Sequence, residues 1–310
     1  MKYANRKAII DCGTNTFHLL IVEMKNKGQF ETLHQEKIAV KIGKGGMKEK
    51  LITQTAKERA TKALTYFRQQ IDLFNIAPNQ IKATATSAFR NATNGKLIAE
   101  ELRQITGITI KIIDGETEAY LIYKGVSATV SFTQQNSLII DIGGGSVEFI
   151  LCNSEGIKWL KSYEIGAQRL IDLFHTVDPI TIDTKKELTS YIDQELKELY
   201  EQCSEYQPTN IIGASGSFDT LVDIYRYYSD GHKLQHPPLS STLPYNSTIE
   251  VIEGIIKKNR KERLAIPGMI TLRVDMIVVA SILIQQVLKK TKIKKIKTTT
   301  YALKEGVLLS

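Results

Sequence analysis

Two segments of the sequence share a pattern that suits phosphate binding. Residues 8–20 read AIIDCGTNTFHLL, and residues 138–150 read LIIDIGGGSVEFI. In each, an apolar run ends in an aspartate and turns through glycine and a hydroxyl residue into a second apolar run. Such a turn gathers backbone N–H groups and a hydroxyl in one concavity, where phosphate oxygens are held well. The aspartate lies beside that phosphate and can hold Mg²⁺ directly or through water.

The two segments begin 130 residues apart, which is about the size of one domain. One such turn alone is also compatible with an ordinary hairpin. Two at this offset indicate two similar domains that present the same loop to a shared cleft. The candidate phosphate-binding residues are Asp11, Gly13, Thr14, Asn15 and Thr16 in the first loop, and Gly143, Gly144, Gly145 and Ser146 in the second.

A third segment, residues 211–217, runs from an apolar pair through Gly-Ala-Ser-Gly-Ser into a predicted helix. Helix N-termini attract anions through their free N–H groups and the helix dipole, so Ser215 and Gly216 are further candidates. The alternative is a routine strand-to-helix turn with Ser217 as the N-cap. None of the three segments has the spacing of a P-loop.

Hydrolysis of a phosphoanhydride also needs a group that positions water. Glu116 and Glu118 lie at the start of a predicted helix but are two residues apart, so at most one of them points into a site. Both could instead be first-turn acids favoured by the helix dipole. Glu148, just after the second loop, and Asp141 are candidates for binding a metal ion. Arg90 has the planar guanidinium that suits a phosphate chain, although a surface arginine at a helix start is equally common.

The elements that must position these residues alternate along the chain. Two short apolar runs in residues 8–22, separated by a turn-rich segment, predict a hairpin. Apolar residues at steps of three and four predict a helix over residues 53–74. The remaining predictions are strands at residues 81–85, 108–113, 138–140, 149–151 and 211–212, helices at 96–106, 116–124, 217 onward and 274–288, a helical face over 188–200, and an irregular loop at 230–247.

Composition limits the class of protein. The chain has 310 residues, enough for two domains, with 42% hydrophobic and 24% charged residues. There is no apolar stretch long enough for a bilayer, no signal-peptide pattern, and the three cysteines are widely spaced. We therefore expect a cytoplasmic protein with reduced thiols and no membrane association.

The net charge of +8 favours anionic partners in general. The densest basic stretch, residues 289–297, is either a helix end followed by a solvated strand face or a surface that binds a polyanion. We do not expect nucleic acid to be the partner. Because of this basic stretch, nucleic-acid binding remains only an alternative.

Seven motifs in sequence order resemble the exopolyphosphatase/pppGpp phosphatase (Ppx/GppA) family. They lie at residues 8–22, 85–92, 115–119, 140–148, 165–170, 213–216 and 303–306. The resemblance covers essentially the whole chain in a short form without the C-terminal helical region of longer members. It implies an α/β fold of two actin-like, ribonuclease-H-like domains with a cleft between them. The expected domains are residues 1–124, with about 298–310 packing back on them, and residues 125–297.

The resemblance also implies a function and site roles. It implies Mg²⁺-dependent cleavage of the terminal phosphoanhydride of polyphosphate or of pppGpp, a nucleotide of the stringent response. By motif, the catalytic glutamate falls on Glu118, which separates it from Glu116. The metal positions fall on Asp141 and Glu148, and the other site positions include Arg90. A homodimer is compatible with the family, and the alternatives are an actin-fold small-molecule kinase and a non-catalytic sensor of polyphosphate or alarmone.

The sequence departs from the usual family pattern at several positions. Cys12, Thr14 and Thr16 replace three residues of the first loop, and the two threonines keep the hydroxyls. Lys304 and Tyr120 stand where arginine is common. These changes predict a weaker phosphate contact near the C-terminus and less positive charge beside Glu118. Without the C-terminal region, we expect less processive action on long polyphosphate.

Overall fold

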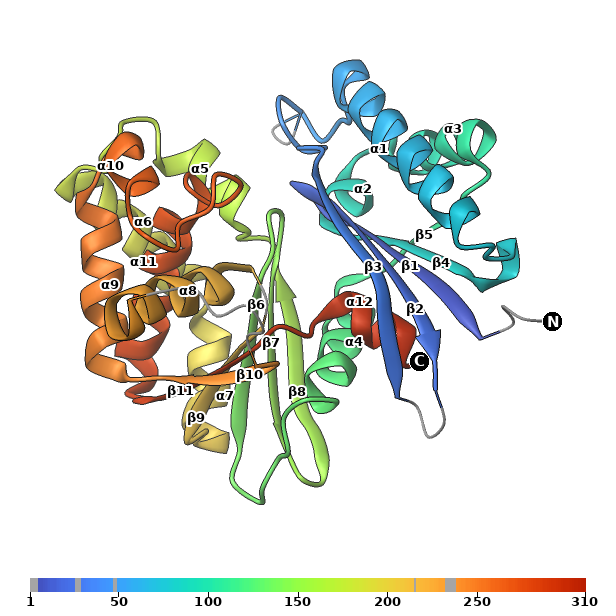
Figure 1. Ribbon diagram of the computed structural model, residues 1–310. Helices are drawn as coiled ribbons and strands as arrows, with labels where there is room; N and C mark the ends of the chain where they lie inside the picture. Colours follow the sequence, from blue (N-terminus) through green and yellow to red (C-terminus); the bar gives the residue numbers. More distant parts are fainter. Residues whose placement is uncertain (1–4, 26–28, 47–48, 215, 232–237) are drawn as a thin grey trace. The chain divides into compact units, whose positions relative to one another are not determined.

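The computed structural model describes residues 5–25, 29–46, 49–214, 216–231 and 238–310 (Figure 1). The chain forms two compact units, Met1–Gly125 with Leu303–Ser310, and Val126–Ala302. The last helix of the chain therefore belongs to the first unit.

The first unit contains a five-stranded mixed sheet in the order β3-β2-β1-β4-β5. Its first three strands are antiparallel neighbours, and β4 and β5 continue the sheet in parallel with β1. The strands are β1 (Arg6–Cys12), β2 (Thr16–Met24), β3 (Phe30–Ala39), β4 (Ile81–Ala85) and β5 (Ile110–Ile112). Because β1, β4 and β5 are parallel, their carboxyl ends lie at one edge of the sheet.

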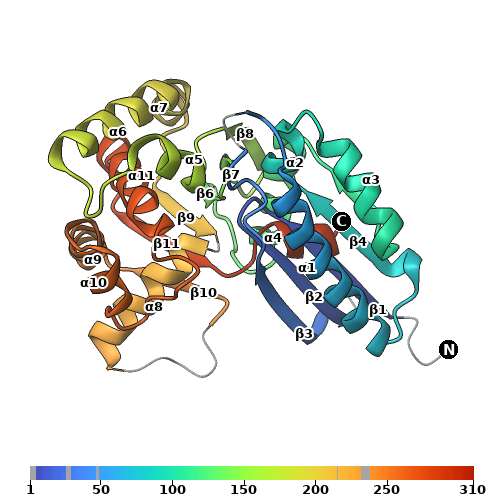
Figure 2. The ribbon, with the colours of Figure 1, turned by 90° about the horizontal axis from the view of Figure 1, so that it is seen from above.

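Helices pack on this sheet through apolar faces. The predicted helix at residues 53–74 is α1 (Gln54–Leu73), whose N-cap Thr53 accepts a hydrogen bond from the amide of Ala56. Figures 1 and 2 show α1 beside α3 (Gly95–Thr106). The other helices of the unit are η2 (Pro78–Gln80), α2 (Ser87–Asn91), α4 (Gly115–Ser127) and α12 (Leu303–Leu308), of which α12 contacts β1.

The second unit repeats this plan. Its sheet has the order β10-β11-β9-β6-β7-β8, in which β6, β7 and β8 are antiparallel neighbours and β6, β9 and β11 are parallel. The strands are β6 (Ser137–Ile142), β7 (Val147–Asn153), β8 (Gly156–Tyr163), β9 (Asn210–Ala214), β10 (Ser240–Leu243) and β11 (Lys295–Thr299). Three antiparallel strands followed by two parallel ones thus occur in both units, and the sequence repeat at residues 8 and 138 begins in the first strand of each.

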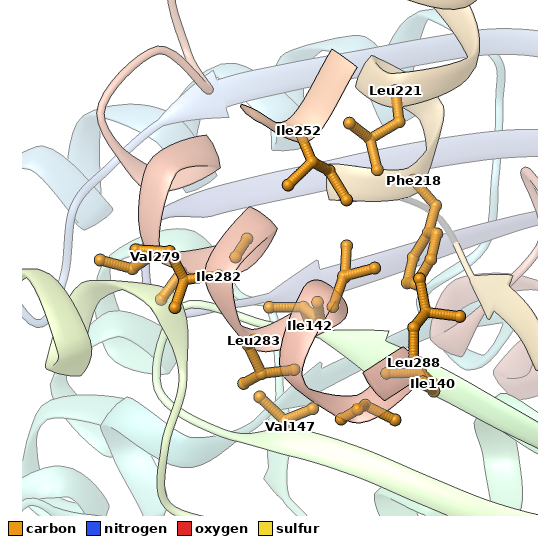
Figure 3. Close-up of a cluster of buried hydrophobic side chains, with 14 of the residues drawn as sticks. Ile140, Ile142, Val147, Phe218, Leu221, Ile252, Val279, Ile282, Leu283 and Leu288 are labelled. Carbon is orange, nitrogen blue, oxygen red and sulfur yellow. The ribbon is translucent and has the colours of Figure 1, made fainter. Parts of the chain in front are cut away.

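The core of the second unit lies between its sheet and its helices. Figure 3 shows side chains from β6, β7, α8, α9 and α11 in one cluster, with Phe218, Ile252 and Leu283 among them. The predicted buried helix at residues 274–288 is the centre of this cluster. The helices are α5 (Ala167–Phe174), α6 (Ile182–Glu195), α7 (Lys197–Tyr206), α8 (Gly216–Asp230), α9 (Tyr245–Lys257), α10 (Arg260–Leu264) and α11 (Met276–Thr291).

Two element predictions were wrong in detail. The helical face over residues 188–200 belongs to two helices, because α6 ends at Glu195 and α7 begins at Lys197. The loop predicted at 230–247 contains the edge strand β10, which pairs with β11, and the start of α9; residues 232–237 lie outside the described part of the chain. Within the described part, no helix is both long and apolar enough to cross a membrane.

Candidate active site

The first phosphate loop is a tight turn between β1 and β2. The amide of Gly13 donates to the carbonyl of Thr16 at 3.1 Å, and the carbonyl of Asn15 accepts from the amides of Val40 and Lys41 at 3.0 and 2.8 Å. The loop is therefore held at both its base and its tip. A Cβ at Gly13 would lie 3.0 Å from the Thr16 carbonyl, so the turn leaves little room for a side chain there.

Side chains of this loop are less available than the sequence implies. Thr14 and Asn15 are buried, and the hydroxyl of Thr16 lies 2.9 Å from Nε2 of His18. The hydroxyl of Thr16 thus has a partner within the loop, and the backbone amides of the turn are further groups that suit phosphate.

The second loop, between β6 and β7, has the same turn. The amide of Gly143 donates to the carbonyl of Ser146 at 3.0 Å, and a Cβ at Gly143 would lie 3.0 Å from that oxygen. The two predicted loops therefore match in geometry as well as in sequence.

The start of α5 fixes the second loop in place. The carbonyls of its three glycines each accept a backbone hydrogen bond, at 2.8 to 3.2 Å, from residues 166–168. Among the described residues no backbone acceptor is recorded for the amides of Gly144, Gly145 and Ser146. Carbonyls that are occupied and amides that are not make this loop suited to an anion.

Gly166 is a functional position that the sequence reasoning missed. A Cβ there would lie 2.3 to 2.4 Å from backbone atoms of Gly145 and Ser146, so only glycine allows α5 to approach the loop this closely. Gly166 lies in the family motif at residues 165–170, but the motif alone does not reveal this contact with the second loop.

The two predicted metal ligands lie on adjacent strands. Asp141 of β6 is paired in register with Glu148 of β7, so both side chains extend from the same face of the sheet. Glu148 is buried, and its Oε1 accepts from the hydroxyl of Ser162 at 2.7 Å.

These residues fit Mg²⁺ bound partly by substrate. Within the described chain no group of three or more His, Cys, Asp or Glu side chains is placed to hold a metal. Mg²⁺ in phosphate-transfer sites is usually held by one or two carboxylates together with substrate phosphates and water. Two carboxylates beside a phosphate loop are consistent with that arrangement.

The third predicted segment ends at the N-terminus of α8. Ser215 lies outside the described residues. Gly216 has a φ of +54°, and the guanidinium nitrogens of Arg273 come within 3.0 and 3.2 Å of the position a Cβ would take there. Burial lowers the pKa of Arg273, while the charges of Asp219 and Asp141 oppose that change.

Arg273 is thus a second residue that the sequence did not reveal. It lies 57 positions after Gly216 and carries no motif of its own, so only the fold brings it to this loop. A guanidinium here places a positive charge beside the segment that the sequence predicts to bind phosphate.

The carboxyl ends of β4 and β5 bring Arg90 and Glu118 together. The amide of Ile113 donates to the carbonyl of Ala85 at 3.0 Å, which joins the two strand ends. Nη1 of Arg90 then lies 2.9 Å from Oε2 of Glu118 and 3.1 Å from the carbonyl of Ile113. Arg90 is therefore not a surface arginine of the ordinary kind.

The structure distinguishes Glu116 from Glu118, which their spacing in the sequence could not do. Glu118 is only 6% exposed and is held by Arg90, whereas Glu116 is exposed to solvent. Asp114 caps the helix, since its carboxylate accepts from the amide and the hydroxyl of Thr117 at 2.7 and 2.9 Å, and these bonds lower its pKa. Of the two acids in the first turn, Glu118 is the one in a restricted environment.

Asp11 lies near the buried ion pair of α12. Nζ of Lys304 is 2.8 Å from Oε1 of Glu305, and both side chains are buried. Burial raises the pKa of Asp11 to about 6; the charges of Lys304 and Lys37 oppose this shift, and Glu305 adds to it. Oδ1 of Asp11 is a buried atom with no hydrogen-bond partner among the described residues, as expected for a group that faces a ligand.

Comparison with known proteins identifies the family. The model of the Ppx/GppA phosphatase family matches residues 20–310. A crystal structure of an exopolyphosphatase from Cytophaga hutchinsonii has a TM-score of 0.93 and 41% identity, covering 98% of this chain and 96% of that one. The Aquifex aeolicus PPX-GPPA enzyme has the same fold, with a TM-score of 0.78 at 22% identity and 98% coverage of both chains.

Curated relatives are longer than this chain. A bifunctional 3-dehydroquinate synthase/phosphatase from Fusobacterium nucleatum is 30% identical over 301 residues, which are 93% of this chain and 44% of the relative. A guanosine-5'-triphosphate,3'-diphosphate pyrophosphatase from Vibrio parahaemolyticus is 30% identical over 217 residues, which are 70% of this chain and 43% of the relative. The chain thus spans less than half the length of these relatives.

The two mixed sheets match the two-domain, actin-like α/β structures of this family, as expected from the motifs. The match begins after the first loop, extends over residues 20–310, and includes the Glu118 motif and the second glycine loop. The chain therefore belongs to the Ppx/GppA phosphatase family.

Proposed function

We propose that this protein removes the terminal phosphate of polyphosphate, with Mg²⁺, and that it accepts pppGpp through the same terminal anhydride. The similarity to the Cytophaga hutchinsonii exopolyphosphatase supports polyphosphate, and the Vibrio parahaemolyticus pyrophosphatase supports the nucleotide. Both substrates present a chain of phosphates with a terminal P–O–P bond.

One observation carries the proposal, namely the buried pair of Glu118 and Arg90 at the carboxyl ends of β4 and β5. A carboxylate that is 6% exposed and held by a guanidinium has a fixed orientation. That is the property required of a residue that positions one water molecule for attack on phosphorus.

In the proposed hydrolysis, Glu118 accepts a proton from the attacking water. The water oxygen forms a bond to the terminal phosphorus while its proton passes to the carboxylate of Glu118. The P–O bond to the bridging oxygen breaks, and the shortened chain leaves with that oxygen. The products are orthophosphate and a polyphosphate or nucleotide with one phosphate fewer.

The glycine loops and Arg273 bind the negative charge of the substrate. Amides of residues 144–146 donate to phosphate oxygens, and the guanidinium of Arg273 adds a positive charge near Gly216. Asp141 and Glu148 would hold the cation, which when bound neutralises charge on the phosphate oxygens.

Phosphate release from defined substrates tests the proposal. Wild-type protein should release orthophosphate from short-chain polyphosphate, long-chain polyphosphate and pppGpp with Mg²⁺, and EDTA should abolish the release. Asp141→Asn should raise the Mg²⁺ concentration needed for half-maximal rate about 10-fold or more. Wild-type protein that releases no phosphate from any of these substrates, or whose rate is unaffected by EDTA, would refute the proposal.

A further inference from the structure

The second unit contains a cavity of about 540 Å³ between α8 and α9, away from the glycine loops. Its volume is in the range of small-molecule sites. Its apolar lining comes from both helices and the segment after α10, and consists of Ile224, Tyr225, Tyr228, Val251, Ile255 and Ile266. Tyr228 is 66% exposed, so most of its ring has no packing partner and is available for stacking.

Gly254 opens this cavity from the side of α9. It lies in the interior of the helix, where glycine is less favourable than alanine. A Cβ at this position would meet nothing within 4 Å, so packing gives no reason for the absent side chain. The space next to Gly254 is instead part of the cavity that this residue lines.

Polar groups lie on either side of this opening. Glu250 and Lys258 also line the cavity, four residues before and four residues after Gly254. Glu250 shares a face of α9 with Gly254, because residues four apart lie on one side of a helix, and Lys258 is the C-cap of α9. A carboxylate and an ammonium thus line the cavity on either side of the glycine. Ser229 and Ser247 add hydroxyl groups to the lining.

This combination suits a planar ring with a specific polar edge. Tyrosine rings and aliphatic side chains favour an aromatic heterocycle stacked between helices. A carboxylate prefers two adjacent N–H donors, and an ammonium prefers a carbonyl oxygen. Guanine offers N1–H and N2–H side by side with O6 next to them, whereas adenine has an acceptor at N1 that a carboxylate would repel.

One segment borders both this cavity and the third phosphate segment. Ile266 lines the cavity, Gly268 packs against the backbone of Asp223 and Ile224, and Arg273 reaches Gly216. Ile224 lies eight residues after Gly216 on α8, which corresponds to about 12 Å along the helix. The cavity is therefore distinct from the phosphate loop but within the length of a nucleotide.

We propose that this cavity binds the guanine base of a guanosine nucleotide. The nucleotide is either the substrate, with its phosphates in the loops, or a separate effector that binds while polyphosphate is hydrolysed. The possibility that the nucleotide is the substrate rests on the proposed function. Binding of guanine in this cavity does not rest on it.

Calorimetric binding of GMP and AMP, without turnover, tests the site directly. Wild-type protein should bind GMP at least 10-fold more tightly than AMP. Glu250→Gln should weaken GMP binding about 10-fold or more and leave AMP unchanged, because only guanine donates two hydrogen bonds to the carboxylate. Gly254→Leu should abolish GMP binding, since its side chain would occupy the open space beside residue 254 where the base is proposed to stack. No GMP binding by the wild type, or equal binding by Gly254→Leu, would overturn the proposal.

Stability and activity measurements exclude a trivial loss of fold. Gly254→Ala should have an unchanged or higher Tm, because alanine favours the helix, and Gly254→Leu should keep wild-type hydrolysis of polyphosphate.

If the base belongs to the substrate, Gly254→Leu raises KM for pppGpp about 10-fold or more. If it belongs to an effector, GMP alters polyphosphate hydrolysis by the wild type and not by Gly254→Leu. Parallel loss of polyphosphate and pppGpp hydrolysis in Gly254→Leu would count against a separate base site. Because GMP binding is read without catalysis, failure of the proposed hydrolysis would leave this result interpretable.

Discussion

At the scale of single residues, the chemistry of this protein depends on how charge is held in buried places. The carboxylate of Glu118 is buried and contacts Arg90, whereas Asp11 lacks an equally close partner and burial raises its pKa to about 6. The sequence could name both acids from their motifs. It could not show this difference, because Arg90 is 28 residues from Glu118 and Lys304 comes from the end of the chain.

Replacing Arg90 by methionine should affect both stability and activity. Removal of one partner of a buried pair leaves the other charge uncompensated, so we expect a loss of about 3 kcal/mol in the free energy of unfolding. The rate of phosphate release should fall at least 10-fold because Glu118 loses its fixed orientation. Urea unfolding and phosphate release measure the two effects.

The matched control is Arg103→Met. Arg103 pairs with Glu100 on the surface of α3, and both side chains are about half exposed. Its removal should change the free energy of unfolding much less than Arg90→Met does and leave activity unchanged. Equal costs for the two arginines would show that the Arg90 pair is not special.

The raised pKa of Asp11 predicts an unusual dependence of stability on pH. Between about pH 4 and 6 the folded protein binds this proton more tightly than the unfolded chain, so the free energy of unfolding falls as pH rises through this window. Above pH 6 the penalty is complete and amounts to at most about 3 kcal/mol. In buffer without divalent cation or phosphate, Asp11→Asn should therefore be more stable than the wild type at pH 7.5 and nearly equal to it at pH 4.

Asp114→Asn provides a comparison of opposite sign. The pKa of Asp114 is lowered by its bonds to Thr117, so its contribution to stability is present at neutral pH and is lost as pH falls. Urea unfolding at both pH values compares the two variants. Destabilisation of both at pH 7.5 would contradict the account of Asp11.

At the scale of elements, the site is built where parallel strands end. The sequence predicted these strands well, because short apolar runs bounded by glycine and acidic residues leave few alternatives. It missed the end of α6 before Leu196 and the edge strand β10. Leu196 continues the apolar period of the helix through the break, and the polar residues of β10 follow two prolines and precede a third, which locally favours a loop.

The contact between α5 and the second glycine loop gives a prediction at this scale. In Gly166→Ala, the new Cβ would overlap the backbone of Gly145 and displace the loop. We expect phosphate release to fall at least 10-fold, since small errors in positioning are costly in catalysis. Gly254→Ala is the control, because its Cβ meets open space and should leave polyphosphate hydrolysis unchanged. A fully active Gly166→Ala variant would mean that the shape of this loop does not matter for catalysis.

At the scale of the whole molecule, one plan occurs twice. Each unit has three antiparallel strands followed by two parallel ones, with a glycine turn after its first strand. The repeat of thirteen residues predicted two similar domains with the same turn, because the Asp-x-Gly turn and the flanking strands are local features, but it did not predict this strand order. Arg273 and Gly166 could not be predicted in the same way, because their roles depend on contacts between distant segments. The shared cleft remains a prediction from the family resemblance.

The net charge of +8 leads to a prediction about substrate capture. The positive field of the protein attracts polyphosphate over long distances. Salt screens this attraction, since the Debye length falls from about 10 Å at 0.1 M to about 3 Å at 1 M. We expect kcat/KM for polyphosphate to fall several-fold between about 0.05 and 0.5 M KCl, with kcat nearly constant. Steady-state kinetics at fixed free Mg²⁺ measures this, and a salt effect confined to kcat would contradict it.

The most direct measurement compares Glu118→Gln with Glu116→Gln in phosphate release from polyphosphate. Both changes remove one negative charge from the first turn of α4, but only Glu118 is buried and paired with Arg90. The account predicts that Glu118→Gln lowers kcat about 100-fold or more without loss of substrate binding, and that Glu116→Gln is close to wild type. Equal activity of the two variants would show that the buried carboxylate does not position the attacking water.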